Sequence, residues 1–273
     1  MLRKRILVCL DVRDGEVVKG VQFRRLQGVG DPVQLAARYQ EAGADEVVLL
    51  DISASVAGRR TLLEVVRGAA ERLFVPLTVG GGISDLEDID RALRAGADKI
   101  SINTAATRQP RLLTEAAARF GSQCVVASID ARREEGGGGS PTAHRRRSPA
   151  PSSGYRVYTH GGRTATNLDA VEWARECAGR GAGEILLTAI HRDGRRQGYD
   201  LDLTRRVVEA VPVPVVASGG AGSAQHLREA FLVAGADAAL VASIFHDGSA
   251  SLAEVKQLLA AEGIPVRPAG DAA

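Results

Sequence analysis

The stretches RILVCLD (5–11) and VVASID (125–130) decide the fold of this chain, because each is an apolar run that ends in a single aspartate, Asp11 or Asp130. Such a run is typical of a strand that is covered on both faces and presents a polar side chain at its carboxyl end. Three further pairs of segments echo each other: GADEVVLLDI (43–52) with GAGEILLTAI (181–190), VGGGI (79–83) with ASGGA (217–221), and AGADKISIN (95–103) with AGADAALVAS (234–243). The sequence therefore predicts a duplicated half-unit.

Short apolar runs recur along the whole chain and are near-continuous rather than alternating, which favours parallel strands. They lie at 6–10, 47–50, 75–79, 99–102, 124–129, 184–190, 213–218 and 238–243. Amphipathic segments with helical spacing lie between them, for example at 31–43, 85–96 and 223–235, and these begin with Asp or Ser and end in Gly. Eight alternations, the half-and-half repeat and the absence of GxGxxG after the first strand favour a closed (β/α)8 TIM barrel over a doubly wound open sheet.

With 273 residues, of which 45% are hydrophobic and 25% charged, the chain is ordinary globular material, and its length fits either two domains or one large barrel. The eight alternations described above favour the barrel. We therefore expect a single barrel domain over residues 1–273. A net charge of +2 gives no reason to expect attraction to nucleic acid or to a membrane surface, so any anion site must be local.

The cysteines and the first residues suggest a cytoplasmic location. Cys9, Cys124 and Cys177 are odd in number and widely spaced in apolar or helical contexts, which favours buried thiols in a reducing compartment over a disulfide or zinc framework. The first apolar run is broken by Asp11, so it is too short for a signal peptide or a membrane span.

One low-complexity segment interrupts the pattern, EEGGGGSPTAHRRRSPAPSSG (134–154). Because its composition is rich in Gly, Pro and Ser, we expect a flexible insertion after the fifth strand, acting as a solvated spacer rather than as part of the site. We also expect a disordered tail at 268–273.

Asp11 and Asp130 are the candidate catalytic residues. In a βα barrel the loops after the strands form the active site, so carboxylates that end strands one and five face each other across its mouth. Either aspartate alone could be a helix cap or a loop hydrogen-bond acceptor. Their matched placement favours paired acid and base work on one substrate.

Two glycine-rich turns are candidate phosphate sites. Gly80–Gly82 follow the third strand, and Gly219 and Gly220 follow the seventh, each before a helix where backbone N–H groups can bind an anion. The next strands add Asn103 and Thr104 to the first turn and Ser243 to the second. A substrate with a phosphate at each end would span the mouth, with its centre between the two aspartates.

These motifs resemble the cyclase subunit of imidazole glycerol phosphate synthase, from histidine biosynthesis. The resemblance covers the chain except for the insertion and the tail after about Arg267, and it rests on RILVCLDVRDGEVVKG (5–20), LLDISAS (49–55), TVGGGI (78–83), DKISINTAA (98–106), GSQCVVASIDA (121–131), GAGEILLTAIHRDGRRQGYD (181–200), ASGGAG (217–222) and GADAALVASIFH (235–246). The sister isomerase of the pathway shares the barrel and both phosphate sockets, but the opening segment and INTAA are more similar to the cyclase.

The resemblance implies that ammonia attacks the ribulosyl ketone of a bis-phosphorylated formimino aminoimidazole carboxamide ribotide. Imidazole glycerol phosphate and aminoimidazole carboxamide ribotide are then the products, with Asp130 as base and Asp11 as acid. Lys19 would help a glycine-punctuated loop (14–30) to close, and Asp193 and Gly194 would contact the second phosphate. The implied substrate-binding residues are Lys19, Gly81, Gly82, Ser101, Asn103, Thr104, Thr188, Asp193, Gly194, Ser218, Gly219, Gly220, Ala242 and Ser243.

The resemblance also implies a partner glutaminase that delivers ammonia through the barrel axis, in a heterodimer. The matching ammonia gate consists of Arg5, Glu46, Lys99 and Glu184, which would otherwise be ordinary charges at strand starts. Residues separated by an even number of positions lie on the same face of a strand. Three of the four gate residues are separated in this way from a site residue on their own strand, but Glu46 lies five positions before Asp51. No cysteine lies in a nucleophile-elbow context, so the glutaminase must be a separate chain.

Two other functions stay open from the sequence: the sister isomerase, acting on the precursor ribotide, and a non-catalytic barrel that serves as a scaffold for the glutaminase. Nucleic-acid binding by the arginine run of the insertion is disfavoured, because no aromatic residues interleave it. The five histidines have no zinc-site spacing, so we expect neither a metal nor another cofactor. His191 replaces an acidic residue expected in the family.

Overall fold

The computed structural model describes residues 2–21, 24–52, 56–134 and 150–270. Most of the expected flexible insertion (134–154) lies outside the described residues, and only Glu134 and residues 150–154 can be placed. Of the expected disordered tail, residues 271–273 lie outside, and residues 269 and 270 form a turn. No helix within these described ranges has the length and apolarity that crossing a membrane requires.

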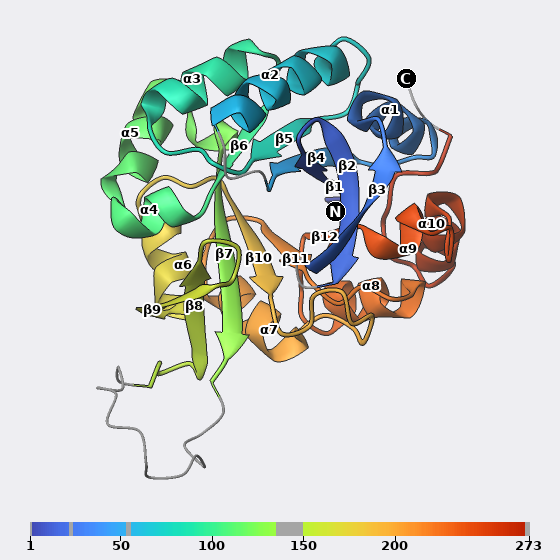
Figure 1. Cartoon of the computed structure of the whole chain (residues 1–273). Helices are drawn as coiled ribbons and strands as arrows, with labels where there is room; N and C mark the ends of the chain where they lie inside the picture. The colour runs from blue at the N-terminus through green and yellow to red at the C-terminus, as the bar shows by residue number, and fades with distance from the viewer. Residues whose placement is uncertain (1, 22–23, 53–55, 135–149, 271–273) are drawn as a thin grey trace.

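Eight parallel strands form a closed barrel (Figure 1), which confirms the predicted fold. Around the barrel they are β1 (Arg5–Arg13), β4 (Glu46–Asp51), β5 (Leu77–Gly80), β6 (Lys99–Ile102), β7 (Val125–Arg133), β10 (Glu184–Ala189), β11 (Val215–Ser218) and β12 (Ala238–Val241). Pairing of β12 with β1 and of β7 with β10 closes the ring. All eight predicted strands are present, with ends shifted by a few residues.

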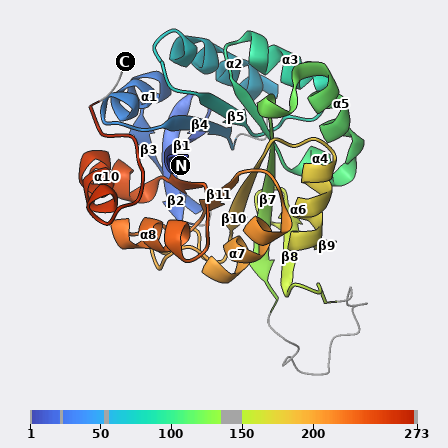
Figure 2. The ribbon, with the colours of Figure 1, turned by 180° about the vertical axis from the view of Figure 1, so that it is seen from behind.

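Helices surround the barrel in both views of the ribbon (Figure 2). They are α1 (Pro32–Glu41), α2 (Val56–Ala70), α3 (Leu86–Arg94), α4 (Thr104–Arg108), α5 (Arg111–Phe120), α6 (Ala170–Gly179), α7 (Leu201–Ala210), α8 (Ala224–Leu232), α9 (Ser243–His246) and α10 (Leu252–Ala261), with a short 3-10 turn η1 (Ser122–Cys124). The predicted caps Asp31 and Asp85 accept hydrogen bonds from backbone N–H groups of α1 and α3, whereas Ser223 makes no such bond to α8.

Two antiparallel hairpins, which the sequence did not predict, extend the strands that carry the aspartates. β2 (Glu16–Val21) pairs with β1 and with β3 (Arg24–Gly30), and β8 (Tyr155–Thr159) pairs with β7 and with β9 (Thr164–Asp169). In register, Asp11 lies opposite Val18, and Asp130 lies opposite Tyr158. Each aspartate therefore sits where a parallel barrel strand becomes the first strand of a hairpin.

The barrel interior is layered. Its middle is an apolar cluster, separate from the larger core between strands and helices, that consists of Leu7, Cys9, Val48, Val126, Leu186, Val216, Ala238 and Leu240. Because side chains alternate along a strand, Arg5, Leu7 and Asp11 lie on one face of β1. The apolar cluster thus separates a charged layer at the amino ends of the strands from a polar layer at their carboxyl ends.

Candidate active site

Asp11 and Asp130 lie on opposite sides of the barrel mouth. Three strands separate β1 from β7 in either direction around the ring, so the two side chains come from diametrically opposed strands. Both carboxyl groups belong to the polar layer at the carboxyl ends of the strands, where barrel enzymes hold their substrates. The geometry agrees with the placement expected from sequence.

Burial makes both aspartates weak acids. It raises the pKa of Asp11 to about 7, with the nearby Asp193 carboxylate adding to the rise and the Cys9 thiol opposing it. It likewise raises the pKa of Asp130 to about 7, again with help from Asp193 and against a hydrogen bond from Asn103. Near neutral pH, each group can therefore exist in either protonation state.

The two carboxyl groups differ in their hydrogen-bond donors. Asn103 Nδ2 donates to Asp130 Oδ2 over 3.0 Å, and the Cys9 thiol, a weaker donor, lies 3.8 Å from Asp11 Oδ1. Burial and Asp11 raise the pKa of Cys9, so the thiol keeps its proton and remains the donor. An amide N–H is a stronger hydrogen-bond donor than a thiol. The Asn103 amide therefore stabilises the ionised form of Asp130 more than the Cys9 thiol stabilises the ionised form of Asp11.

Asp193 has an electrostatic role that the sequence did not reveal. It follows β10, and burial raises its own pKa against a hydrogen bond from the Gly194 N–H group. Its charge acts on both Asp11 and Asp130, which places it near both carboxyl groups. Only the folded chain brings these three residues together, so spacing along the sequence could not show it.

The glycine turns approach neighbouring strands too closely for side chains. At Gly81, φ is +90° and a Cβ would lie 2.1 Å from the Asp51 carbonyl oxygen. At Gly219, φ is +87° and a Cβ would lie 2.8 Å from the Ala189 carbonyl oxygen. Both positions therefore require glycine, and they occupy equivalent places after β5 and β11.

The turns that follow β6 and β12 also match. Asn103 precedes α4 with φ −116° and ψ −85°, and Ala242 precedes α9 with φ −133° and ψ −71°. Neither residue caps its turn with a side-chain hydrogen bond, so among the described residues the first backbone N–H groups of these turns have no cap from the preceding side chain. We call Gly81, Gly82, Asn103 and Thr104 the first socket, and Gly219, Gly220, Ala242 and Ser243 the second socket.

Of the remaining predicted substrate-binding residues, Asp193 and Gly194 follow β10, and the other four lie on strands. Ser101, Thr188 and Ser218 lie on the inner faces of β6, β10 and β11, where Thr188 pairs in register with both Asp130 and Ser218. Lys19 belongs to β2 opposite Gln27, away from the barrel ring, and its side chain lies outside the described part.

At the opposite end of the barrel, Arg5, Glu46, Lys99 and Glu184 form a closed ring of ion pairs, which we call the charge ring. Arg5 bonds Glu46 over 3.0 Å and also bonds Glu184. Lys99 Nζ lies 2.7 Å from Glu46 and 2.9 Å from Glu184. Each cation therefore bridges both carboxylates.

Glu46 and Asp51 are separated by an odd number of positions, and the structure explains why. Glu46 shares the inner face of β4 with Val48 and Leu50, whereas Asp51 lies on the other face, so Asp51 was the wrong reference residue. Thr78 on β5, which the sequence did not single out, donates its hydroxyl to Glu46. The Glu46 side chain is only 1% exposed, so these partners replace water for a buried charge.

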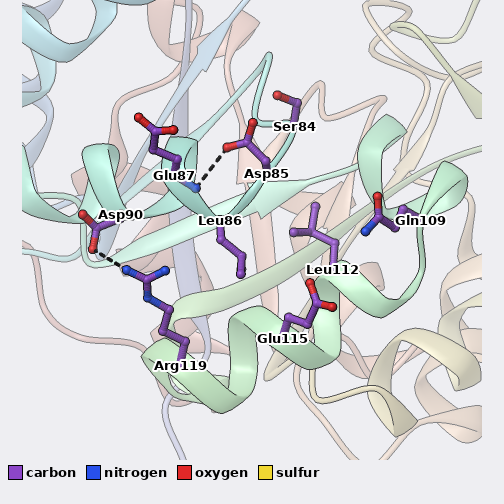
Figure 3. A pocket seen from close by; sticks show the side chains of 9 residues that line it. All are labelled: Ser84, Asp85, Leu86, Glu87, Asp90, Gln109, Leu112, Glu115 and Arg119. Atoms are coloured by element: carbon purple, nitrogen blue, oxygen red, sulfur yellow. Dashed lines mark hydrogen bonds and ion pairs between the residues drawn. The ribbon is translucent and has the colours of Figure 1, made fainter.

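A surface pocket also lies away from the barrel mouth. A pocket of about 450 Å³ lies between α3 and α5, outside the barrel mouth (Figure 3). Several of its polar groups have partners, since Asp85 caps α3 and Asp90 pairs with Arg94 and Arg119.

His191 bonds a structural carboxylate rather than a site residue. Its Nε2 lies 3.0 Å from Asp200 Oδ2, and Asp200 also accepts from the Tyr155 hydroxyl and caps α7. Across residues 2–21, 24–52, 56–134 and 150–270, no cluster of three His, Cys, Asp or Glu side chains could hold a metal ion.

Comparison with known proteins gives full-length matches. A family model described as "Histidine biosynthesis protein" matches residues 5–251. The imidazole glycerol phosphate synthase subunit HisF of Myxococcus xanthus is 60% identical over 267 residues, which cover 98% of this chain and 99% of that protein. The subunits of the same name from Geobacillus kaustophilus and Anoxybacillus flavithermus are each 56% identical over 267 residues, covering 98% of this chain and 100% of each relative.

Proposed function

The chain belongs to the family of histidine biosynthesis proteins, and from this premise we infer that it is the cyclase subunit of imidazole glycerol phosphate synthase. The observation that carries this inference is the high identity, over essentially the whole chain, to relatives that bear this name. The reaction joins ammonia to the ribulosyl ketone of the bis-phosphorylated formimino ribotide. It releases water from the ketone, together with imidazole glycerol phosphate and aminoimidazole carboxamide ribotide.

The two aspartates move the protons that this reaction requires. Imine formation, cleavage of the amidine and ring closure each need a proton added or removed at the centre of the substrate. The pKa of each carboxyl group is about 7, so one can be ionised while the other is protonated. Because Asn103 favours the ionised form of Asp130, we assign Asp130 as the base and Asp11 as the acid.

Each socket binds one terminal phosphate. The matching glycine turns and uncapped backbone N–H groups of the two sockets support this assignment, since both can donate to an anion. Gly194 and the hydroxyls of Ser101, Thr188 and Ser218 complete the binding surface. Lys19, on the β1–β2–β3 extension, closes over the bound substrate.

A partner glutaminase supplies the ammonia. The relatives are named as subunits, and we propose that the partner forms a heterodimer by docking at the charge-ring end of the barrel. Ammonia then crosses from the charge ring to Asp11 and Asp130 along the barrel axis. The buried thiols of Cys9 and Cys177 fit a reducing, cytoplasmic location.

Turnover by the purified chain tests this function. The formimino ribotide and an ammonium salt at alkaline pH should give imidazole glycerol phosphate, detected as loss of substrate absorbance and by product chromatography. In a parallel assay, the precursor ribotide of the sister isomerase should not be consumed. Conversion of the precursor would favour the isomerase, and binding of the ribotide without turnover would favour the scaffold.

A further inference from the structure

Arg108 is a cation next to the first socket. It is the last residue of α4, a helix that begins at Thr104, and it is exposed. Its guanidinium lies 2.8 Å from His160 Nε2. Within the described ranges no carboxylate pairs with Arg108, in contrast to Arg111 on the next helix, which pairs with Glu115 over 3.2 Å.

The direction of the side chain places this charge near the socket. Residues four apart lie on one face of a helix, and the Cα–Cβ bonds tilt toward the helix N-terminus, so Arg108 reaches back over Thr104. His160 confirms the proximity, because its backbone N–H donates to Thr104 Oγ1 over 3.1 Å while its ring contacts Arg108. Arg108, His160 and Thr104 therefore form one contiguous group.

The turn between β8 and β9 fixes His160. A guanidinium can only donate hydrogen bonds, so Nε2 is the acceptor and the ring proton is on Nδ1, which lies 3.0 Å from Thr159 Oγ1. Arg163 Nε donates to the His160 carbonyl oxygen over 2.7 Å. His160 has φ +55°, a left-handed conformation that is rare for residues other than glycine. Such strained residues are concentrated at functional sites.

We propose that Arg108 is a further substrate-binding residue, whose guanidinium contacts the phosphoryl group in the first socket and is positioned by His160. The proposal rests on the proposed function. One N–H group of the guanidinium is bonded to His160, which leaves others to form charge-assisted hydrogen bonds with phosphoryl oxygens. Arg108 thereby adds a full charge to a socket otherwise built from backbone N–H groups and neutral side chains.

Steady-state kinetics with the formimino ribotide and saturating ammonium tests the proposal in three variants. For Arg108→Ala we expect KM to rise about fivefold to tenfold with kcat unchanged, the effect of one exposed charge-assisted contact. Arg108→Lys should restore part of this loss, since it keeps the charge without the planar fork. Arg111→Ala, the matched control, should leave KM unchanged.

Salt dependence gives a second readout. Added KCl should raise KM less steeply in Arg108→Ala than in the parent chain or in Arg111→Ala, because an exposed attraction is screened by salt. An unchanged KM in Arg108→Ala, or a loss confined to kcat, would overturn the proposal. Absence of turnover in the parent chain would instead refute the proposed function, so the two failures are distinguishable.

Discussion

At the scale of single residues, chemistry here depends on where three half-buried carboxyl groups lie rather than on unusual residue types. Asp11, Asp130 and Asp193 lie far apart in sequence, and burial raises the pKa of each. Because Asp193 adds negative charge near both catalytic candidates, it adjusts the pH at which they can exchange protons.

Asp193→Asn should move the pH profile of kcat/KM to lower pH. Removing the negative charge lowers the pKa of both Asp11 and Asp130, so the rising limb from the base and the falling limb from the acid shift together. Measurement from pH 5 to 9 would show the shift, with Asp90→Asn on α3 as the control. An unmoved profile would contradict the role of Asp193, whatever happens to KM.

Asp11→Asn should stabilise the fold at pH 8. A carboxyl group whose pKa rises to about 7 on folding binds its proton more tightly in the native state, so its contribution to stability is lost as pH rises from about 4 to about 7. Asparagine is neutral throughout and avoids this loss, which is on the order of 2–4 kcal/mol. Chemical denaturation should show a higher free energy of unfolding for Asp11→Asn than for the parent chain at pH 8, and a smaller difference at pH 4.5. Equal stability of the two proteins at pH 8 would refute this prediction.

The sequence predicted the positions of Asp11 and Asp130 because an apolar run that ends in a carboxylate indicates the end of a barrel strand. It also led to both sockets, because glycine pairs before helices are local signals. Sequence alone could not show that Asn103 contacts Asp130, or that the Asp193 charge raises the pKa of Asp130. Both effects depend on strands that are distant in sequence and adjacent in the fold. Arg108 was missed for the same reason, since its partner His160 is on another hairpin.

At the scale of elements, the hairpins after β1 and β7 were not predicted. A hairpin signal was present, since Asp14-Gly15 occupies the turn between β1 and β2 with φ values of +51° and +86°. The glycine-punctuated composition of residues 14–30 favoured a loop instead. For β8 and β9, the neighbouring low-complexity segment obscured the alternation in YRVYT (155–159).

Lys99→Met should destabilise the barrel, because it leaves the buried Glu46 and Glu184 with one cation, Arg5, between them. Loss of one member of a buried ion-pair network leaves charge uncompensated, and we expect about 2–3 kcal/mol from chemical denaturation. The exposed Arg94, which pairs with Asp90 on α3, provides the matched control.

Arg94→Met should leave the free energy of unfolding within experimental error. The double variant Lys99→Met, Glu184→Gln should recover part of the lost stability, because it removes one of the two carboxylates that share Arg5. If Lys99→Met were as stable as the control, the charge ring would not act as a coupled network.

At the scale of the whole molecule, one closed barrel separates two functional ends. The charge ring occupies the amino ends of the strands, the aspartates and sockets occupy the carboxyl ends, and the apolar layer lies between them. Periodicity predicted the barrel because near-continuous apolar runs alternate with helical segments. The order of strand pairing, and hence the opposition of β1 and β7, followed from that fold.

The segment between Glu134 and Gly154 should be removable. Its two ends are joined by strand pairing, with Arg133 opposite Tyr155 and the Glu134 N–H donating to the Gly154 carbonyl over 2.9 Å. Replacing residues 136–149 with Asn-Gly should therefore preserve both the melting temperature and ammonium-dependent turnover. A rise in KM for the ribotide, with unchanged melting temperature, would show that the segment takes part in substrate binding.

Ammonium-dependent turnover of Asp130→Asn and Asp11→Asn, each checked for folding and for ribotide binding, tests the central claim most directly. Without a base at Asp130, we expect kcat to fall by about 100-fold or more while the ribotide still binds, and we expect a comparable loss without the acid at Asp11. Full turnover by a folded Asp130→Asn variant would contradict the assignment of the opposed aspartates as the catalytic pair.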